Sequence, residues 1–596
     1  MRKNSLLKKL ALGISLLLCA TTMSAAKTYF ASANGNWDND GLSSSTAWPL
    51  EQALIDEAMS NGDKLVIVGN IVLDNTIEII NKSITITGYN ALNAPDEENR
   101  ASSLDGGSAG RIFDISGEGE VIIANLVLKN ATNKAIQIDG SEGPLAVNIG
   151  YCLFKENSSN RPSSDGPDNG AGVTVVGGAI ANIFSCWFHN NQAFRGGALF
   201  VDGSFVDVQY TNFEGNFTNA NVNEANARGG AVACAGAYTL EFNYCIFKGN
   251  YSRRGGGCIF EYGQGEFTVK NSVLTDNHSG HDWFLEIVLN DDGEDIGVHV
   301  APGDNHGGLM KTDGGSVITF INTTIYKNNA YDDAIGGAFI ISGGEFTMIN
   351  CTVTENMTNG NQFHTGGLFI ENNANVKIYN SIIDRNKAAG GSFWSDFAGN
   401  SESATYEIKN SIIGAYRNAV TADMDDISRP KYGNTNTESQ DDYNFNTPPG
   451  DTFNAANLGI FFLNSVPLLP NAINTTKVGD FSYLANLGIE TDQIGNTIVP
   501  ENGKIFAGAL QFAGTQDEAE NHIKYVLPDE KPCSLYAAYS DSKCTGNDIY
   551  NPFADNNDAV IVAYYTILGQ KLDKEPASGM FIIKYSNGKS VKVVKK

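Results

Sequence analysis

The chain has 596 residues, with 40 Lys or Arg against 67 Asp or Glu, and its formal net charge at pH 7 is −27. Such an acidic chain disfavours nucleic acid as a partner, because cationic groups must neutralise the phosphates. It also repels polyanions unless a divalent cation bridges the two. The 64 glycines, together with Asn-rich turns between short apolar runs, are typical of many short strands.

Residues 1–26 have the three parts of a secretory signal peptide. A basic start is followed by an apolar run at 10–19, which is too short to span a bilayer, and by small residues at 24–26. We therefore expect an exported protein that begins at Lys27 after processing. No later stretch of the sequence is long and apolar enough to predict a transmembrane helix.

Residues 27–62 are expected to cap the open end of the fold that follows. The segment 49–59 places small and apolar side chains on one side and predicts a short amphipathic helix. Strands are expected at 64–68, 76–80 and 83–87, where β-branched residues are frequent.

A repeat of two motifs runs through the middle of the chain, from about 154 to 386. One motif is a hydrophobic anchor, two variable residues and Asn; the other is a Gly-Gly pair before an apolar alternation. The spacing from the glycine pair to the next anchor is nearly constant, as from Gly196 to Phe213, whereas the length from Asn to the next pair varies widely. A constant half and a variable half are typical of a solenoid whose insertions leave at one corner.

The repeated Asn residues are interpreted as a structural ladder rather than as ligands. Asn tolerates left-handed backbone, and its amide can bond to the turns above and below. The residue two positions before each anchor is Cys, Ser or Thr, which predicts a second interior column of small side chains. The ladder residues are Asn157, Asn191, Asn216, Asn250, Asn277, Asn329, Asn356 and Asn386.

The predicted fold class is all-β, a right-handed single-stranded parallel β-helix with a small β-sandwich-like module at the C-terminus. The motif period predicts coils of about 25 residues with three strands each. The absence of helical patterns between strands excludes βαβ units. The β-helix is expected at 63–415, its C-terminal rungs and closing module at 416–511, a linker at 512–556 and the small module at 557–596. In that module Asn587 and Gly588 are a hairpin signal between two alternating strands.

The repeat resembles that of polymorphic outer-membrane proteins, with which it shares the Phe-x-x-Asn and Gly-Gly-Ala motifs. The segments 28–48 and 466–510 resemble the opening and closing parts of secreted bacterial β-helix proteins of the pectate-lyase-like superfamily. Polymorphic outer-membrane proteins end in an autotransporter barrel, for which the residues after Gln511 are too few.

The last 40 residues resemble a type IX secretion sorting domain, on the residues 564–570, 579–584 and 588–596. That resemblance implies the type IX secretion machinery as a partner. It also implies a location at the surface or in the medium of a Gram-negative bacterium.

The longest insertion, 278–306, is the best candidate for a ligand site. An aromatic ring near carboxylates suits sugar binding or calcium coordination, and calcium is the one cofactor that the sequence suggests. A solvated loop over the rung edge is the alternative. The candidate ligand-binding residues are His281, Trp283, Asp291, Asp292, Glu294 and Asp295.

Cysteines and catalytic motifs add little to this assignment. Cys533 and Cys544 lie in the polar linker, where an oxidising exterior would favour a disulfide between them. Asp-Asp pairs occur, but the Asn-Thr-Asp, Gly-His-Gly and Arg-Ile-Lys motifs of polygalacturonase-type hydrolases do not accompany them. No catalytic residue and no metal ligand is therefore assigned.

The leading functional hypothesis is an adhesin-like, monomeric surface protein that binds a carbohydrate or host-matrix ligand without catalysis. The alternative is a polysaccharide lyase or glycoside hydrolase that works in a groove beside the 278–306 loop. A third interpretation, a passive structural stalk, predicts no preferred ligand.

Overall fold

The computed structural model describes most of the solenoid and parts of the chain that follows it. The residues described are 26–89, 102–159, 169–218, 227–280, 307–331, 334–360, 364–388, 393–399, 403–413, 435–436, 479–493, 497–505, 507–509, 561–566, 571–572, 574, 579–585 and 590–595. Among them, no helix is both long and apolar enough to cross a bilayer. The chain divides into two compact units, one with the solenoid and one with the C-terminal strands.

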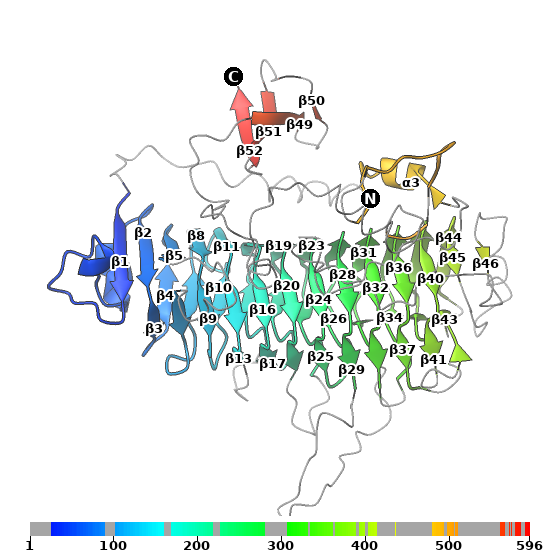
Figure 1. Ribbon diagram of the computed structural model, residues 1–596, viewed down its shortest axis with the longest axis horizontal. Helices are drawn as coiled ribbons and strands as arrows, with labels where there is room; N and C mark the ends of the chain where they lie inside the picture. The colour runs from blue at the N-terminus through cyan, green and yellow to red at the C-terminus, as the bar shows by residue number, and fades with distance from the viewer. Residues whose placement is uncertain are drawn as a thin grey trace, which may run out of the picture. The chain divides into compact units, whose positions relative to one another are not determined.

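The solenoid is a parallel β-helix, as the repeat predicts (Figure 1). Four sheets run along it, called sheets A, B, C and D here, and a full rung passes through them in the order A, B, D, C. The repeat pattern predicts three strands per coil, whereas the structure has four; the strands of sheet D have only two residues each and so show no alternation in the sequence. All pairs within these sheets are parallel except β41 with β42, which closes sheet D.

Sheets A and B each contain 13 strands. Sheet A consists of β1 (Thr28–Ser32), β2 (Lys64–Val68), β5 (Thr85–Gly88), β8 (Gly119–Ala124), β11 (Leu145–Gly150), β15 (Ile180–Phe184), β19 (Phe205–Gln209), β23 (Thr239–Asn243), β27 (Glu266–Lys270), β31 (Val317–Ile321), β35 (Glu345–Ile349), β39 (Asn375–Tyr379) and β44 (Thr405–Lys409). Sheet B consists of β3 (Asn70–Val72), β6 (Ser103–Asp105), β9 (Val127–Lys129), β12 (Leu153–Lys155), β16 (Trp187–His189), β20 (Asn212–Glu214), β24 (Ile246–Lys248), β28 (Val273–Thr275), β32 (Thr324–Tyr326), β36 (Thr352–Thr354), β40 (Ile382–Asp384), β45 (Ile412–Ile413) and β46 (Thr435–Asn436).

Sheet C contains 11 strands and sheet D nine. Sheet C consists of β4 (Ile77–Ile80), β7 (Phe113–Ser116), β10 (Ile136–Asp139), β14 (Val173–Val176), β18 (Leu199–Asp202), β22 (Val232–Ala235), β26 (Ile259–Glu261), β30 (Met310–Thr312), β34 (Phe339–Ser342), β38 (Leu368–Glu371) and β43 (Phe397–Gly399). Sheet D consists of β13 (Ser158–Ser159), β17 (Gln192–Ala193), β21 (Phe217–Thr218), β25 (Tyr251–Ser252), β29 (His278–Ser279), β33 (Asn329–Ala330), β37 (Met357–Thr358), β41 (Lys387–Ala388) and β42 (Phe393–Trp394).

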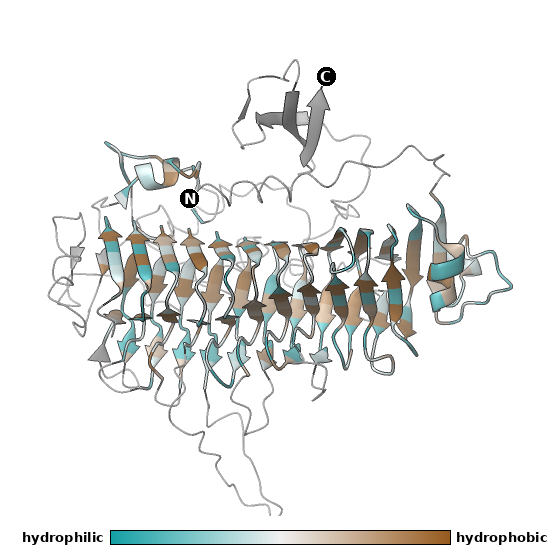
Figure 2. Cartoon of the chain, turned by 180° about the vertical axis from the view of Figure 1, so that it is seen from behind, coloured by the Kyte–Doolittle hydropathy of each residue, from teal (hydrophilic) through white to brown (hydrophobic). Residues whose placement is uncertain are grey.

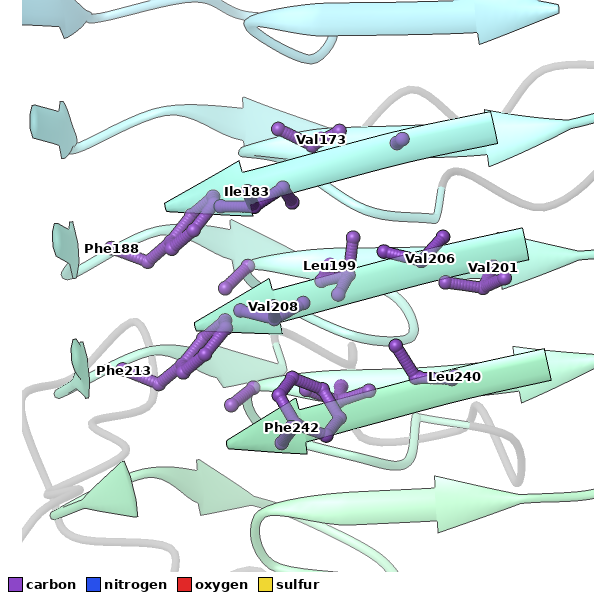
Figure 3. Close-up of a cluster of buried hydrophobic side chains, with 14 of the residues drawn as sticks. Val173, Ile183, Phe188, Leu199, Val201, Val206, Val208, Phe213, Leu240 and Phe242 are labelled. Carbon is purple, nitrogen blue, oxygen red and sulfur yellow. The ribbon is translucent and has the colours of Figure 1, made fainter. Parts of the chain in front are cut away.

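The core is a set of columns in which the same rung position stacks on itself. The anchors Phe154, Phe188, Phe213 and Phe247 are fully buried, and their ring centroids lie 4.5, 4.9 and 4.7 Å apart. Aliphatic side chains of sheets A and C point at these rings from the other walls (Figure 3). Hydropathy separates the apolar long strands from the polar short strands of sheet D (Figure 2).

The Asn column forms a continuous buried ladder. In each step the side-chain Nδ2 makes two hydrogen bonds: it donates to an anchor carbonyl of the preceding rung and to Oδ1 of the next Asn. Asn216 Nδ2, for example, lies 2.9 Å from Phe188 O and 3.0 Å from Asn250 Oδ1. The same Oδ1 also accepts from the backbone N–H of the preceding Asn, as Asn250 does from Asn216 at 3.0 Å. The column ends at Asp396, whose Oδ1 accepts from both Asn386 nitrogens at 2.7 Å.

One predicted ladder residue is wrong: Asn328, not Asn329, belongs to the column. Asn328 Nδ2 donates to Leu274 O and Asn356 Oδ1, whereas Asn329 lies in β33 of sheet D. The motif was read from Tyr326, but the residue that pairs with Leu274 is Ile325. Both side chains are buried, so hydrophobicity alone could not distinguish the anchor from its neighbour.

The small-residue column follows the corrected register, because Thr323 stands two positions before Ile325; the cysteines of this column are buried and not in disulfides. In the rung that follows Gly336, the residue paired with Gly336 is Thr365 and not a glycine. The glycine pairs themselves are required by contact, since a Cβ at Gly197 would lie 2.4 Å from Gly230 O.

The N-terminal end of the solenoid is covered by the predicted cap. A short π-helix, η2 (Leu54–Ala58), replaces most of the expected α-helix and buries Leu54 and Ile55 against the first rung. Lys82 Nζ donates to the carbonyl oxygens of Ile55 and Met59 (2.9 Å for the latter), which satisfies the end of this turn. A 3-10 helix, η1 (Ser44–Thr46), precedes it.

The described residues 479–493, 497–505 and 507–509 do not add rungs. They form a strap along the corner between sheets A and B. The strap contains β47 (Gly479–Asp480), α3 (Ser482–Ala485) and β48 (Lys504–Ile505). Gln493 is fully buried; its Nε2 donates to Ser272 O and its Oε1 accepts from Thr324 Oγ1, both at 2.7 Å. The strap therefore fastens rungs that are far from it in sequence.

The C-terminal strands form a separate antiparallel sheet in the order β50-β49-β51-β52. These are β49 (Ile561–Thr566), β50 (Lys571–Leu572), β51 (Gly579–Tyr585) and β52 (Ser590–Lys595). β51 pairs with β52 antiparallel, as the hairpin signal between them predicts.

Candidate functional site

The insertions of the repeat leave the solenoid at one corner, as the spacing predicts. The insertions 160–168, 219–226 and 281–306 each follow a strand of sheet D and precede a strand of sheet C. A further insertion, 90–101, interrupts an earlier rung between sheets A and B. The corner between sheets D and C is therefore the edge that carries most of the added chain within the repeat.

The sequence-predicted site residues lie outside the part of the chain that the structure describes. These are His281, Trp283, Asp291, Asp292, Glu294 and Asp295, and the same holds for Cys533 and Cys544. The described start of the insertion is His278, whose ring lies 4.8 Å from that of Tyr251 and 6.2 Å from that of Tyr331. The described residues that lie beside this corner are on the outer face of sheet C.

The outer face of sheet C, beside this corner, carries aromatic side chains where a solvated strand would carry polar ones. Phe200, Ala233 and Phe260 occupy the same position in three successive rungs and are nearly buried. Tyr262 packs on them, with its ring 5.0 Å from that of Phe260 at an interplanar angle of 22°.

Two arginines lie over these rings and extend along the solenoid axis. The guanidinium carbon of Arg195 is 4.8 Å from the centroid of Tyr262, and its Nη1 donates to the Tyr262 hydroxyl at 3.1 Å. Arg228 lies 4.9 Å over Phe260 and donates to Asp313 Oδ2 at 2.7 Å. Such contacts hold the planar guanidinium groups in fixed orientations.

A lysine completes what we call the basic–aromatic cluster: Arg195, Arg228, Phe260, Tyr262, Lys311 and Asp313. Lys311 follows Phe260 in the outward column and lies 3.3 Å from Asp313 Oδ1. Three cations thus lie close to the carboxylates of Asp313 and Asp202, in a chain whose net charge is −27. Side-chain exposure is 16% for Arg228, 8% for Lys311 and 33% for Asp313, so the charges are partly shielded from water.

This arrangement suits an anionic group beside an apolar surface. Arginine presents a planar fork that matches carboxylate geometry, and an aromatic ring accepts the apolar face of a sugar. Burial raises the pKa of the Tyr262 hydroxyl, which favours its neutral, hydrogen-bonding form. Among the described residues no group of three or more His, Cys, Asp or Glu side chains is placed to hold a metal ion.

Sequence reasoning missed the two arginines, although a signal was present. Arg195 and Arg228 each stand directly before a Gly-Gly-Ala sequence, and they pair in adjacent rungs. A repeated basic residue at a fixed offset from the glycine pair predicts a charged column.

A second buried charge lies on the inner side of the same strands. Glu261, at the end of β26, points inward, and its Oε1 accepts from Gly263 N (2.7 Å) and Ser316 Oγ (2.6 Å). Burial raises the pKa of this carboxyl group. Because it is fully enclosed, Glu261 belongs to the core and not to a ligand surface.

Comparison with known proteins gives no family model that matches the chain. A curated relative, the metabotropic glutamate receptor-like protein R of Dictyostelium discoideum, is 25% identical over 148 residues, which cover 22% of this chain and 9% of that protein. The chain thus spans about a tenth of the length of that relative.

Solved structures of similar architecture include carbohydrate-active enzymes. The pectate lyase Pel9A is 12% identical with a TM-score of 0.39, covering 82% of this chain and 97% of that one. A mannuronic acid specific polysaccharide family 6 lyase from human gut microbiota is 12% identical with a TM-score of 0.33, covering 84% and 99%. A GH87 alpha-1,3-glucanase from Streptomyces thermodiastaticus is 11% identical with a TM-score of 0.33, covering 68% and 70%. At these identities and TM-scores, no activity is transferred to this chain.

Proposed function

We propose that this chain is an exported β-helix protein that binds an acidic carbohydrate on the outer face of sheet C, in an adhesin-like role. The single observation that carries the proposal is the basic–aromatic cluster, which concentrates cations over aromatic rings in an acidic protein. Its position beside the corner of the long insertions agrees with the ligand edge inferred from the repeat. Export is supported by the signal-peptide pattern at 1–26 and by the resemblance of 557–596 to a sorting domain.

Binding is favoured over glycoside hydrolysis by the composition of the cluster. Glycoside hydrolysis needs two carboxyl groups that flank the scissile bond. Of the carboxylates beside the cluster, Asp313 already bonds to Arg228 and Lys311, and Asp202 acts on Tyr262 from the neighbouring strand, so no free pair of carboxyl groups is seen among the described residues. The alternative, a polysaccharide lyase or glycoside hydrolase, remains the second proposal for this edge.

The proposal is tested by titrating the full-length mature protein with polyuronates and with neutral polysaccharides. Arg228→Gln removes a charge-assisted contact that is typically worth about 1.5–3 kcal/mol, so polyuronate affinity should fall by about 10-fold or more. Lys377→Met is the matched control, because Lys377 pairs with Glu345 at 2.9 Å on sheet A, away from the cluster. Equal losses in both variants would show that binding follows net charge alone.

Analysis of the polysaccharide after incubation separates binding from catalysis. Intact chains are expected. New reducing ends without unsaturation would indicate a hydrolase, and unsaturated ends would indicate a lyase. Either product would replace the adhesin-like assignment with the enzymatic one.

A further inference from the structure

The first rung of the solenoid contains a buried carboxyl group that two backbone N–H groups hold in place. Asp63 stands directly before β2 and is 4% exposed. Its Oδ2 accepts from Ser60 N at 2.8 Å, which closes the turn after η2, and its Oδ1 accepts from Lys27 N at 2.7 Å. The two oxygens of this side chain therefore join the turn to the residue that precedes β1.

Asp63 has no cationic partner in the described part of the chain, where no Lys, Arg or His side chain forms an ion pair with it. Burying an ionised carboxylate is costly unless hydrogen bonds and an opposite charge compensate. In the uncleaved chain both partners of Asp63 are neutral amides. The hydrogen bonds are therefore present, and the opposite charge is not.

The backbone nitrogen that already contacts Asp63 can supply this charge. Residues 1–26 have the pattern of a signal peptide, and processing is expected before Lys27. Hydrolysis of the Ala26–Lys27 peptide bond transfers the water oxygen to the Ala26 carbonyl carbon, which leaves as a carboxylate. Both water protons go to Lys27 N, which becomes an α-ammonium group and stays mostly protonated at neutral pH.

The start of β1 holds this nitrogen beside Asp63. Lys27 O accepts from Lys64 N at 2.8 Å, and Thr28 pairs with Lys64 at the first position of the parallel β1–β2 ladder. Ala26 and the side chain of Lys27 are exposed, whereas the Lys27 N–H donates to the buried carboxyl group. A chain that begins at Lys27 keeps these contacts, because none of them involves Ala26.

We propose that Asp63 is a binding site for the α-ammonium group of Lys27, which removal of the signal peptide creates. The hydrogen bond from a neutral amide then becomes an ion pair between two full charges, whose attraction is stronger where water is largely excluded. The ion pair fixes the start of β1, whose Tyr29 and Ala31 are buried in the core. The N-terminal end of the solenoid therefore reaches its full stability only after processing.

This inference rests on the export part of the proposed function, since it requires a cleaved signal peptide. It does not depend on carbohydrate binding, because Asp63 lies at the first rung and the basic–aromatic cluster lies on later rungs. The two proposals can therefore fail separately.

The test compares the full-length mature chain, which begins at Lys27, with a chain that begins at Ser24 and so keeps residues 24–26. Hydrogen exchange at the Lys64 amide reports the opening of β1 from β2, because this amide donates to Lys27 O. The extension removes the charge, so the protection factor of this amide should fall by about 5-fold or more. In Asp63→Asn the same extension should change it by about 2-fold or less.

Two controls separate the charge from other effects. Glu57→Gln removes an exposed carboxylate of η2 in the same cap, and in this variant the extension should act as it does in the wild type. Acetylation of the α-amino group removes the charge without changing Asp63, so it tests the proposal even if Asp63→Asn does not fold. It should lower the protection factor as the extension does.

Mass spectrometry of the chain processed in a Gram-negative host should give Lys27 as the first residue. A different first residue, unchanged protection after acetylation, or an equal effect of the extension in Asp63→Asn would overturn the proposal. An unprocessed chain would overturn it together with the export part of the proposed function, whereas correct processing without an effect of the charge would overturn it alone.

Discussion

The neighbouring residues Asn328 and Asn329 allow the ladder to be tested with two variants that differ in position by one residue. Asn328 Oδ1 accepts from Asn277 N (3.1 Å) and Asn277 Nδ2 (2.9 Å), and Asn328 Nδ2 donates to Leu274 O (3.0 Å) and Asn356 Oδ1 (2.9 Å). Asn328→Ala removes all four hydrogen bonds. Asn329→Ala removes a half-buried side chain from the outer side of sheet D.

The cost of Asn328→Ala follows from the groups left behind. Asn277 Nδ2 keeps a bond to Phe247 O, and Asn356 Oδ1 keeps a bond from the backbone N–H of residue 328. The Asn277 N–H loses its acceptor and stays buried, whereas Leu274 loses one contact of its carbonyl but stays paired with β32. At about 1–3 kcal/mol for the buried unsatisfied N–H and about 1 kcal/mol for the other bonds lost, the variant should lose about 3 kcal/mol of unfolding free energy. Asn329→Ala should change it by about 0.5 kcal/mol or less.

Urea-induced unfolding, followed by far-ultraviolet circular dichroism, measures both values in the same protein. Hydrogen exchange at the Asn277 amide locates the effect, because rungs of a solenoid open locally before the whole chain unfolds. A loss for Asn329→Ala equal to that for Asn328→Ala would refute the register described above. A loss below about 1 kcal/mol for Asn328→Ala would show that water satisfies the orphaned Asn277 N–H.

Three further predictions concern the core, the strap and export. Burial raises the pKa of Glu261, so the folded state binds this proton more tightly than the unfolded state does, and the stability that it contributes is present below the unfolded-state pKa and is lost as pH rises through the folded-state pKa. The Tm of Glu261→Gln relative to that of the wild type should therefore rise between pH 4 and pH 8. An equal difference in Tm at both pH values would contradict this prediction. Gln493→Ala should lower the unfolding free energy by about 2 kcal/mol, because it breaks two buried hydrogen bonds, and an unchanged urea midpoint would show that the strap does not brace the rungs. Deletion of 564–596 should leave the protein in the periplasm of a host with type IX secretion, as measured by fractionation, and undiminished surface display would exclude a sorting role.

The fold was predictable because each structural position of a solenoid recurs in the sequence once in every rung. The phenylalanine anchors and the Asn column could be recognised from repetition alone, and their pairing is confirmed. The register failed at Asn329 because Ile325 and Tyr326 are both buried apolar residues, so the local pattern fits two alignments. Sheet D was missed because a strand of two residues has no detectable period.

The candidate site was less predictable, since it depends on contacts between rungs. Arg195 meets Tyr262 two rungs further along, at a separation of 67 residues that no local pattern reveals. The strap could not be foreseen for the same reason, as Gln493 bonds to Ser272 across 221 residues.

The carboxylate that ends the Asn ladder has a consequence for changing the length of this solenoid. Each amide in the column passes one of its Nδ2 hydrogen bonds toward the C-terminal end, so the last Asn needs an acceptor that requires no donor partner of its own. The carboxyl group of Asp396 meets that need, because its Oδ1 accepts from both nitrogens of Asn386. A shorter solenoid built from the same rungs could therefore be closed by an Asp in place of the first Asn removed. Extra rungs would belong between existing Asn residues, where each new amide both receives and passes on a hydrogen bond.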